Sequence, residues 1–221
     1  MRKLLVLLLV LGLGTVSWAD SKEENLERID KANKVLQELL NAPDEGIPVE
    51  VLDGAHCVAV IPDMFKAGFI FGGRHGKGVL SCRNAAGAWS PPIFLTLSGG
   101  SFGLQIGVEK ADVVLFFMNE KGARSLVESK FTLSGKAGVS AGPVGRTAEA
   151  STDIKLNAEI YSYAKSKGLF AGISLEGARL APDNDALKRF YGESARPDSV
   201  LFHQKAPSRP QAVEPFLKAL P

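Results

Sequence analysis

A glycine-rich turn that carries Arg74, His75 and Lys77 holds the residues best suited to binding chemistry. Guanidinium and ammonium groups make strong charge-assisted hydrogen bonds to phosphate, and glycines leave backbone N–H groups accessible to an anion. The turn therefore suits contact with the headgroup of an anionic lipid and needs no catalysis. Lys66 and Arg146 are weaker candidates for the same contact. The alternative for each of these residues is a charge in a solvated turn.

Two motifs that resemble nucleotide-binding or catalytic sequences lack essential parts. Residues 72–78 are similar to a phosphate-binding loop, but Phe71 occupies the position of its first glycine, and a glycine replaces its Ser or Thr. Residues 99–103 match the G-x-S-x-G pattern of a nucleophile elbow, which needs a helix after the serine, whereas residues 104–108 continue as a predicted strand. The histidine that follows, His203, lies in a proline-rich tail. We therefore expect neither an enzyme nor a cofactor.

The cysteines and histidines suggest a disulfide more readily than a metal site. Cys57 and Cys82 lie 25 positions apart, which suits a disulfide between two early strands in an oxidising compartment. Two small buried thiols are an equal alternative. The three histidines, at positions 56, 75 and 203, show no ligand-like spacing, so we expect no metal.

The first nineteen residues have the features of a secretory signal peptide. Arg2 and Lys3 precede an apolar run over residues 4–16, and the small residues Ser17 and Ala19 stand where a signal peptidase reads. A membrane anchor is the rival, but the apolar run is too short to span comfortably and no second one follows. We expect cleavage after Ala19 and a periplasmic or secreted product.

The charge balance limits the kinds of partner. The whole chain has 26 Lys and Arg against 24 Asp and Glu; without Arg2 and Lys3, the mature chain has 24 of each. Binding to nucleic acid through bulk positive charge is therefore not expected, although a local basic patch is compatible with this balance. About 200 mature residues fit one domain with appendages.

Hydrophobic periodicity predicts a helix over residues 22–41, which covers the core or, alternatively, seeks a membrane. Shorter helices are predicted over 48–52, 120–126, 183–191 and 213–220. Between them the pattern is typical of an antiparallel meander, with Asp112 either paired with a base or solvated at a strand edge. The predicted strands cover residues 57–61, 68–73, 77–83, 93–97, 98–108, 111–118, 131–133, 136–141, 149–157, 159–164 and 169–178.

The strand over residues 98–108 is two-faced. One face carries apolar side chains, whereas the other carries glycine, serine and Gln105. The residues of the apolar face are Phe102, Leu104, Ile106 and Val108. Glycines at every second position of a strand indicate sharp curvature or a closely approaching backbone. We therefore predict an α+β fold: a curved glycine-rich antiparallel sheet or partial β-barrel, flanked by an N-terminal amphipathic helix and short helices. The expected organisation is a signal peptide (1–19), a helical segment (20–54), the main domain (55–192) and a proline-rich tail (193–221).

Several segments together resemble the SYLF domain family, over roughly residues 51–191. These are residues 59–62 (AVIP), 66–74 (KAGFIFGGR), 76–80 (GKGVL), 89–92 (WSPP), 98–107 (SGGSFGLQIG), 112–115 (DVVL), 142–146 (GPVGR), 161–163 (YSY) and 167–177 (KGLFAGISLEG).

The resemblance implies a lipid-binding module. Eukaryotic members of the family bind phosphoinositide membranes, and some yeast members also bind and bundle actin. This chain lacks the adaptor domains of the eukaryotic members, and its expected export makes actin an unlikely partner. We therefore expect a non-enzymatic lipid-binding protein of the bacterial cell envelope that contacts anionic phospholipid headgroups. The alternative is a structural or protein-partner-binding envelope module without lipid affinity.

Overall fold

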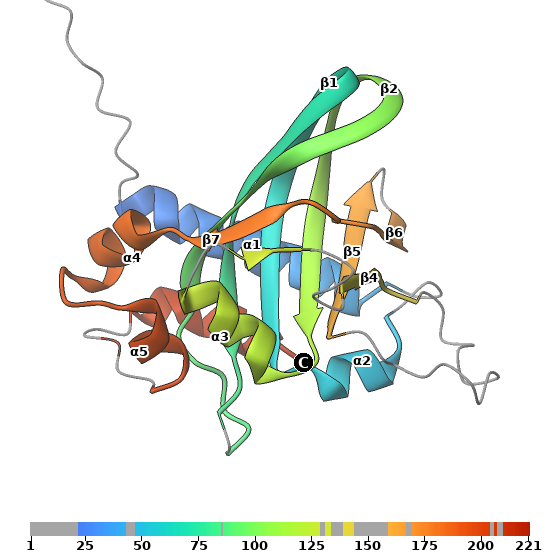
Figure 1. Cartoon of the computed structure of the whole chain (residues 1–221). Helices are drawn as coiled ribbons and strands as arrows, with labels where there is room; N and C mark the ends of the chain where they lie inside the picture. The colour runs from blue at the N-terminus through green and yellow to red at the C-terminus, as the bar shows by residue number, and fades with distance from the viewer. Residues whose placement is uncertain are drawn as a thin grey trace, which may run out of the picture.

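The computed structural model combines a strongly curled sheet with surrounding helices (Figure 1). It describes residues 22–42, 47–84, 86–128, 131–133, 139–143, 159–166, 169–203, 206 and 210–221, with the backbone alone at 69–71, 101–107, 139 and 166. The expected signal peptide, Arg146 and the predicted strand 149–157 lie outside these residues. The helices are α1 (Lys22–Leu40), α2 (Val49–Gly54), α3 (Glu120–Glu128), α4 (Asn184–Tyr191), α5 (Pro197–Leu201) and α6 (Glu214–Ala219). The strands are β1 (Cys57–Cys82), β2 (Ile93–Phe117), β3 (Phe131–Thr132), β4 (Val139–Ala141), β5 (Ile160–Ser166), β6 (Leu169–Gly172) and β7 (Arg179–Pro182).

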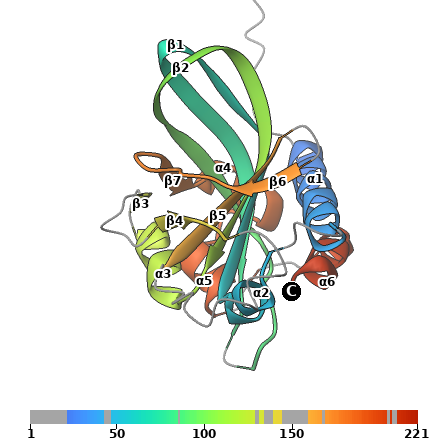
Figure 2. The same cartoon turned by 90° about the vertical axis from the view of Figure 1, so that its right-hand side faces the viewer.

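The two longest strands, β1 and β2, form an antiparallel ribbon that folds back on itself. Cys57 pairs with Phe117 at one end of the ladder, and Leu80 pairs with Ile93 at the other. The ribbon rises out of the body, bends and returns, which both views show (Figures 1 and 2). The first and last residues of β1 consequently lie side by side, with the Cα atoms of Cys57 and Cys82 4.0 Å apart.

Pro62 does not end a strand, contrary to the sequence-based prediction. β1 runs through it with a register shift between Ile61 and Met64, so the three strands predicted over residues 57–61, 68–73 and 77–83 are one. Asp63 adopts a φ of 50° at this bulge, and its N–H donates to Asp112 Oδ1 at 3.0 Å. A proline is tolerated at a bulge because the ladder needs no N–H there. Asp112 thus holds the backbone of the bulge, a role that neither of its predicted alternatives included.

The remaining strands extend both arms of the ribbon into a half-barrel, which confirms the predicted α+β class (Figure 2). β7 pairs with β2 near its start, at Leu95, and β5 pairs with β2 near its end, at Phe117. β3 then pairs with β7, and β6 pairs with β5. β4 pairs with β5 in parallel, so the described sheet is mixed where we expected it to be antiparallel throughout. The predicted strand 169–178 is also shorter than expected, because β6 ends at Gly172.

The glycines of the ribbon mark two close approaches of backbone. A Cβ placed on Gly99 would lie 2.9 Å from Ala178 Cα, so the segment before β7 covers this bare position, as predicted. A Cβ on Gly78 would lie 2.2 Å from Val60 O, because the two arms of β1 touch there. Gly103 and Gly107 belong to the part of β2 of which only the backbone is described.

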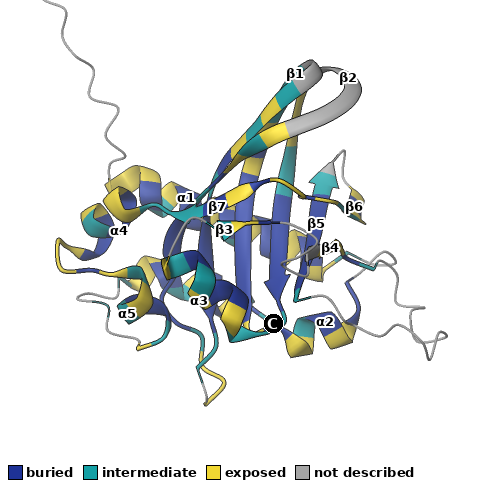
Figure 3. Ribbon diagram, in the orientation of Figure 1, coloured by how far each residue is buried: buried dark blue, intermediate teal, exposed yellow. Residues whose placement is uncertain are grey.

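Helix α1 packs against β1 and covers the core, which confirms the preferred interpretation of its apolar stripe. Ile29, Leu36 and Leu39 are buried, and Figure 3 shows the buried residues concentrated in the lower part of the sheet. The buried Arg28 pairs with Asp183 at 3.2 Å. Among the described helices, none is both long enough and apolar enough to cross a membrane.

The C-terminal segment is part of the fold and contains two helices where we expected at most one. Pro197 opens α5 and Pro215 lies in the first turn of α6, positions where a missing N–H costs no intrahelical hydrogen bond. Phe216 is fully buried. The carbonyl of Pro221 accepts a hydrogen bond from Trp89 Nε1 at 3.1 Å. The prediction of a proline-rich tail outside the fold is therefore wrong, because two of its prolines lie in the first turns of helices.

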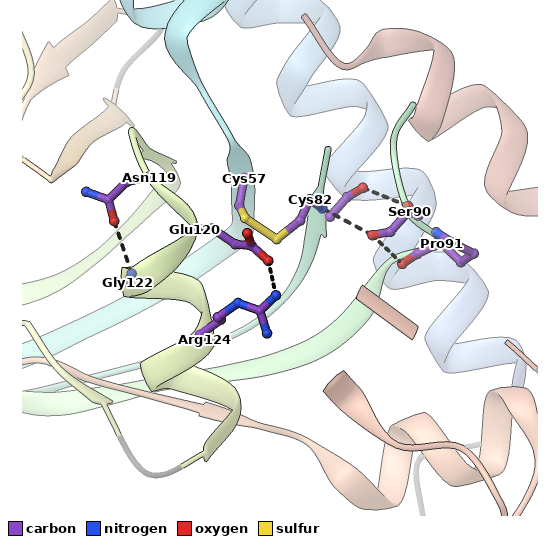
Figure 4. Close-up of a disulfide and its surroundings, with 9 residues drawn as sticks. Cys57, Cys82, Ser90, Pro91, Asn119, Glu120, Gly122 and Arg124 are labelled. Carbon is purple, nitrogen blue, oxygen red and sulfur yellow. Dashed lines mark hydrogen bonds and ion pairs between the residues drawn. A yellow bond between two sulfur atoms is a disulfide. The ribbon is translucent and has the colours of Figure 1, made fainter. Parts of the chain in front are cut away.

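A disulfide closes the base of the ribbon (Figure 4). Cys57 Sγ and Cys82 Sγ are bonded, and both residues are fully buried. Next to them, Cys82 N–H donates to Ser90 Oγ at 3.1 Å, and Ser81 Oγ donates to Ser90 O at 2.7 Å. The bridge joins the first and last residues of β1 inside the core, at the end of the ribbon away from its exposed part.

Candidate functional site

A cleft of about 450 Å³ lies between one face of the ribbon and the segment around β6. We call it the apolar cleft. Its volume falls in the range of small-molecule sites, about 300–1,000 Å³. Most of its wall is aliphatic, and three charged residues and one serine join it. The lining residues are Met64, Lys66, Arg74, Glu109, Ala111, Ala164, Leu169, Ala171, Ile173, Ser174 and Leu175.

The charged residues of the apolar cleft come from both strands of the ribbon. Lys66 on β1 and Glu109 on β2 are Cα partners in the antiparallel register. Lys66 is half-buried, whereas Glu109 is exposed. Arg74 enters from the returning arm of β1 and is also half-buried. The fold therefore brings two predicted headgroup residues, Lys66 and Arg74, into one cleft with a single acid.

The guanidinium of Arg74 also ties parts of the backbone together. Nε and Nη2 donate to Gly100 O at 3.3 and 3.1 Å, and Nη2 donates to Glu176 O at 3.4 Å. Burial lowers the pKa of Arg74, but the ordinary pKa of an arginine is so high that the group keeps its charge at neutral pH. These bonds use Nε and Nη2, and Nη1 has no hydrogen bond to the described residues.

His75 and Lys77 lie on the opposite face of the ribbon from Arg74, because successive side chains of a strand alternate. They line a second cleft, also of about 450 Å³, between the ribbon and α1. We call it the charged cleft. Lys77 Nζ pairs with Glu24 Oε1 at 3.4 Å, and Lys31 Nζ pairs with Asp63 Oδ2 at 3.4 Å. The predicted basic set is therefore divided between two sites, while Arg146 lies outside the described residues.

Sequence reasoning missed the aliphatic wall of the apolar cleft. Leu169, Ala171, Ile173 and Leu175 occupy every second position of one segment. Such alternation puts residues on a common side in extended chain, and this signal was available in the sequence. Its partner across the cleft, Lys66, lies about 100 positions earlier and could not be assigned without the fold. Within the described residues, no group of three or more His, Cys, Asp or Glu side chains could hold a metal.

Comparison with known proteins identifies the family. The family model described as "Ysc84: Las17-binding protein actin regulator" matches residues 98–221. The chain belongs to the Ysc84 (SYLF) family. The matched range holds most of β2, from residue 98 on, and the cleft wall over residues 169–175, but it begins after Lys66 and Arg74. The resemblance drawn from the sequence motifs is thus confirmed.

Individual relatives share about a third of their residues with this chain. LAS seventeen-binding protein 3 of Saccharomyces cerevisiae is 36% identical over 198 residues, which cover 86% of this chain and 42% of that protein. SH3 domain-containing YSC84-like protein 1 of Xenopus laevis is 37% identical over 179 residues, 78% of this chain and 53% of the relative. The human protein of the same name is 34% identical over 178 residues, which cover 78% of this chain and 52% of that protein. The chain spans about half the length of these relatives.

The family description concerns binding and regulation, in line with the expectation of a non-enzymatic module. The names of the family and of the yeast relative agree less well with the partners expected from the sequence. We judged actin unlikely because we expect export, whereas the family description names an actin regulator and the yeast relative is named for binding Las17.

Proposed function

We propose that this protein binds anionic lipid in the apolar cleft without chemical turnover. The observation that carries the proposal is the presence, in one cleft, of two cations and an aliphatic wall. Lys66 and Arg74 are suited to a phosphate through charge-assisted hydrogen bonds. The wall from Leu169 to Leu175 is suited to the adjoining part of an acyl chain.

The two halves of the cleft contribute unequally to affinity. Burying a methylene contributes about 0.8 kcal/mol, so six methylenes give roughly 5 kcal/mol before the costs of association. An ion pair at a partly exposed site contributes about 0–1 kcal/mol. The apolar wall therefore supplies most of the affinity, and Lys66 with Arg74 selects an anionic headgroup.

We further propose that the protein acts in the bacterial cell envelope after export. The signal-like residues 1–19 support this location. Because the mature chain has no net charge, diffuse electrostatic attraction of the whole molecule is weak. Its selectivity for anionic lipid then depends on local contacts such as those of Lys66.

Vesicle co-sedimentation tests the proposal. Anionic vesicles should recruit the mature protein more than neutral ones, and Lys66→Ala should lower the bound fraction about threefold. Lys121→Ala, the same change at an exposed position of α3, is the matched control and should bind like the wild type. Lipid extraction followed by mass spectrometry then distinguishes a lipid held in the cleft from binding at the membrane surface.

The second candidate function is protein-partner binding without lipid affinity. The names of the relatives favour it, since they refer to Las17 and the family description refers to actin. Co-sedimentation with actin filaments tests it directly. Failure to bind any anionic or total-envelope lipid would contradict the lipid proposal and leave this alternative.

A further inference from the structure

The ribbon carries an exposed apolar patch where it leaves the body. Along β2, residues 113–117 are buried, whereas Val108 is 69% exposed. On β1, Phe65 is 41% exposed. Ala67 and Val108 are Cα partners, and Phe65 pairs with Lys110, so Phe65 is the diagonal neighbour of Val108. We call Phe65, Ala67 and Val108 the ribbon patch.

The ribbon patch lies on the face opposite the apolar cleft. Lys66 and Glu109 line that cleft, and their neighbours along each strand point the other way. Phe65 accordingly lines the charged cleft. The patch is thus a surface separate from the proposed lipid site.

The charge of the ribbon differs from that of the rest of the chain. Residues 64–77 and 98–111 contain four Lys or Arg and one acid, Glu109. Subtracting these from 26 and 24 leaves 22 Lys and Arg against 23 Asp and Glu elsewhere. A projecting ribbon with apolar residues and a net positive charge complements an anionic bilayer surface, which attracts cations and accepts apolar side chains.

We propose that the ribbon patch enters the interfacial region of an anionic bilayer and orients the protein on the membrane. The proposal rests on the lipid binding argued above and adds the part of the molecule that contacts the bilayer. Val108 is its most exposed residue, and the exposed Lys110, the Cα partner of Phe65, lies on the same face of the ribbon.

A matched pair of valines tests the proposal. Val49 is 60% exposed, comparable to Val108. It belongs to α2, which lies at the other end of the molecule from the bend of the ribbon (Figure 1). With vesicles of phosphatidylglycerol and phosphatidylcholine, Val108→Asp should lower the bound fraction at least fivefold. Val49→Asp should change it less than twofold. Thermal melts should match the wild type for both variants, since both positions are exposed.

Insertion depth gives an independent readout. The indole introduced by Val108→Trp should be quenched by lipids brominated in their acyl chains, whereas that introduced by Val49→Trp should not. Unquenched fluorescence would overturn the proposal even if Val108→Asp weakened binding. A change of oligomeric state in Val108→Asp on size-exclusion chromatography would also overturn it, because the patch would then be covered by a second copy.

The two proposals fail in distinguishable ways. If the wild type binds no vesicles of any composition, the proposed function is wrong. If the wild type binds and Val108→Asp binds equally well, lipid binding stands and the ribbon patch is not the membrane contact.

Discussion

The two clefts beside β1 have the same volume but opposite chemistry. In the charged cleft, Glu24, Glu27 and Asp63 stand among Arg28, Lys31 and Lys77, so cations and acids balance. In the apolar cleft, two cations share a largely aliphatic wall with Glu109. Basic residues that are close in sequence thus have different roles. Lys77 pairs with Glu24 on α1 and fastens the ribbon to that helix, whereas Lys66 and Arg74 line a cleft with an excess of cations.

The largest expected loss of stability comes from removing the disulfide, which joins the two ends of the strand that both clefts share. Replacing Cys57 and Cys82 together by Ser should lower the free energy of unfolding by about 3–4 kcal/mol, because the unfolded chain regains the freedom of a loop of about 25 residues. Urea denaturation of the variant and the wild type measures this difference.

Free-thiol labelling of the unreduced, denatured protein checks the premise. No label should be incorporated. Two labelled thiols per chain would show that the bridge is absent and would remove the reason for the loss of stability.

Arg74 and Lys77 should differ in their effect on stability, which sharpens the comparison between the clefts. Arg74→Ala removes three hydrogen bonds to backbone carbonyls and should lower the free energy of unfolding by about 1–2 kcal/mol. Lys77→Ala removes an exposed ion pair with Glu24 and should lower the free energy of unfolding by about 0.5 kcal/mol or less. Urea denaturation of the two single variants measures both losses. Equal losses in the free energy of unfolding would contradict the roles assigned to these residues. From the sequence alone, replacing both residues would be expected to leave the fold intact.

Filling the apolar cleft should weaken lipid binding with little effect on stability. Ala171 lines the cleft and is exposed, so Ala171→Trp occupies space meant for an acyl chain. We expect about a fivefold loss in vesicle or lipid binding. Ala86→Trp, at an exposed turn outside both clefts, is the matched control. Undiminished binding by Ala171→Trp would exclude this cleft as the lipid site.

Elements determined by nearby residues were predictable. The apolar spacing of α1 and the short helix α4 are local signals, and Asp183 caps α4 by accepting a hydrogen bond from Ala186 N–H at 3.0 Å. The bulge at Asp63 was not predictable, because its partner Asp112 lies 49 positions away. The same holds for β7, whose pairing with β2 joins positions more than 80 residues apart.

The site was predictable only in its residue types. The sequence indicates cations and glycines near Arg74, but their division between two clefts depends on the continuous strand β1, which was predicted as three separate strands. Once Pro62 is accommodated in a bulge, the alternation of β1 decides which side chains face α1 and which face β6. The bulge at Pro62 therefore helps to set the composition of both clefts, together with a second register shift between Gly68 and Ile70.

The return of β1 to its own starting point also has a mechanical consequence. A load applied at the far end of the ribbon is divided between two arms, each held along its edge by another strand, β5 for one arm and β7 for the other. Both ladders are loaded in shear, so several hydrogen bonds must break together, and the Cys57–Cys82 bridge prevents the arms from separating at the base. A load on the ribbon would therefore reach the body without unzipping either ladder.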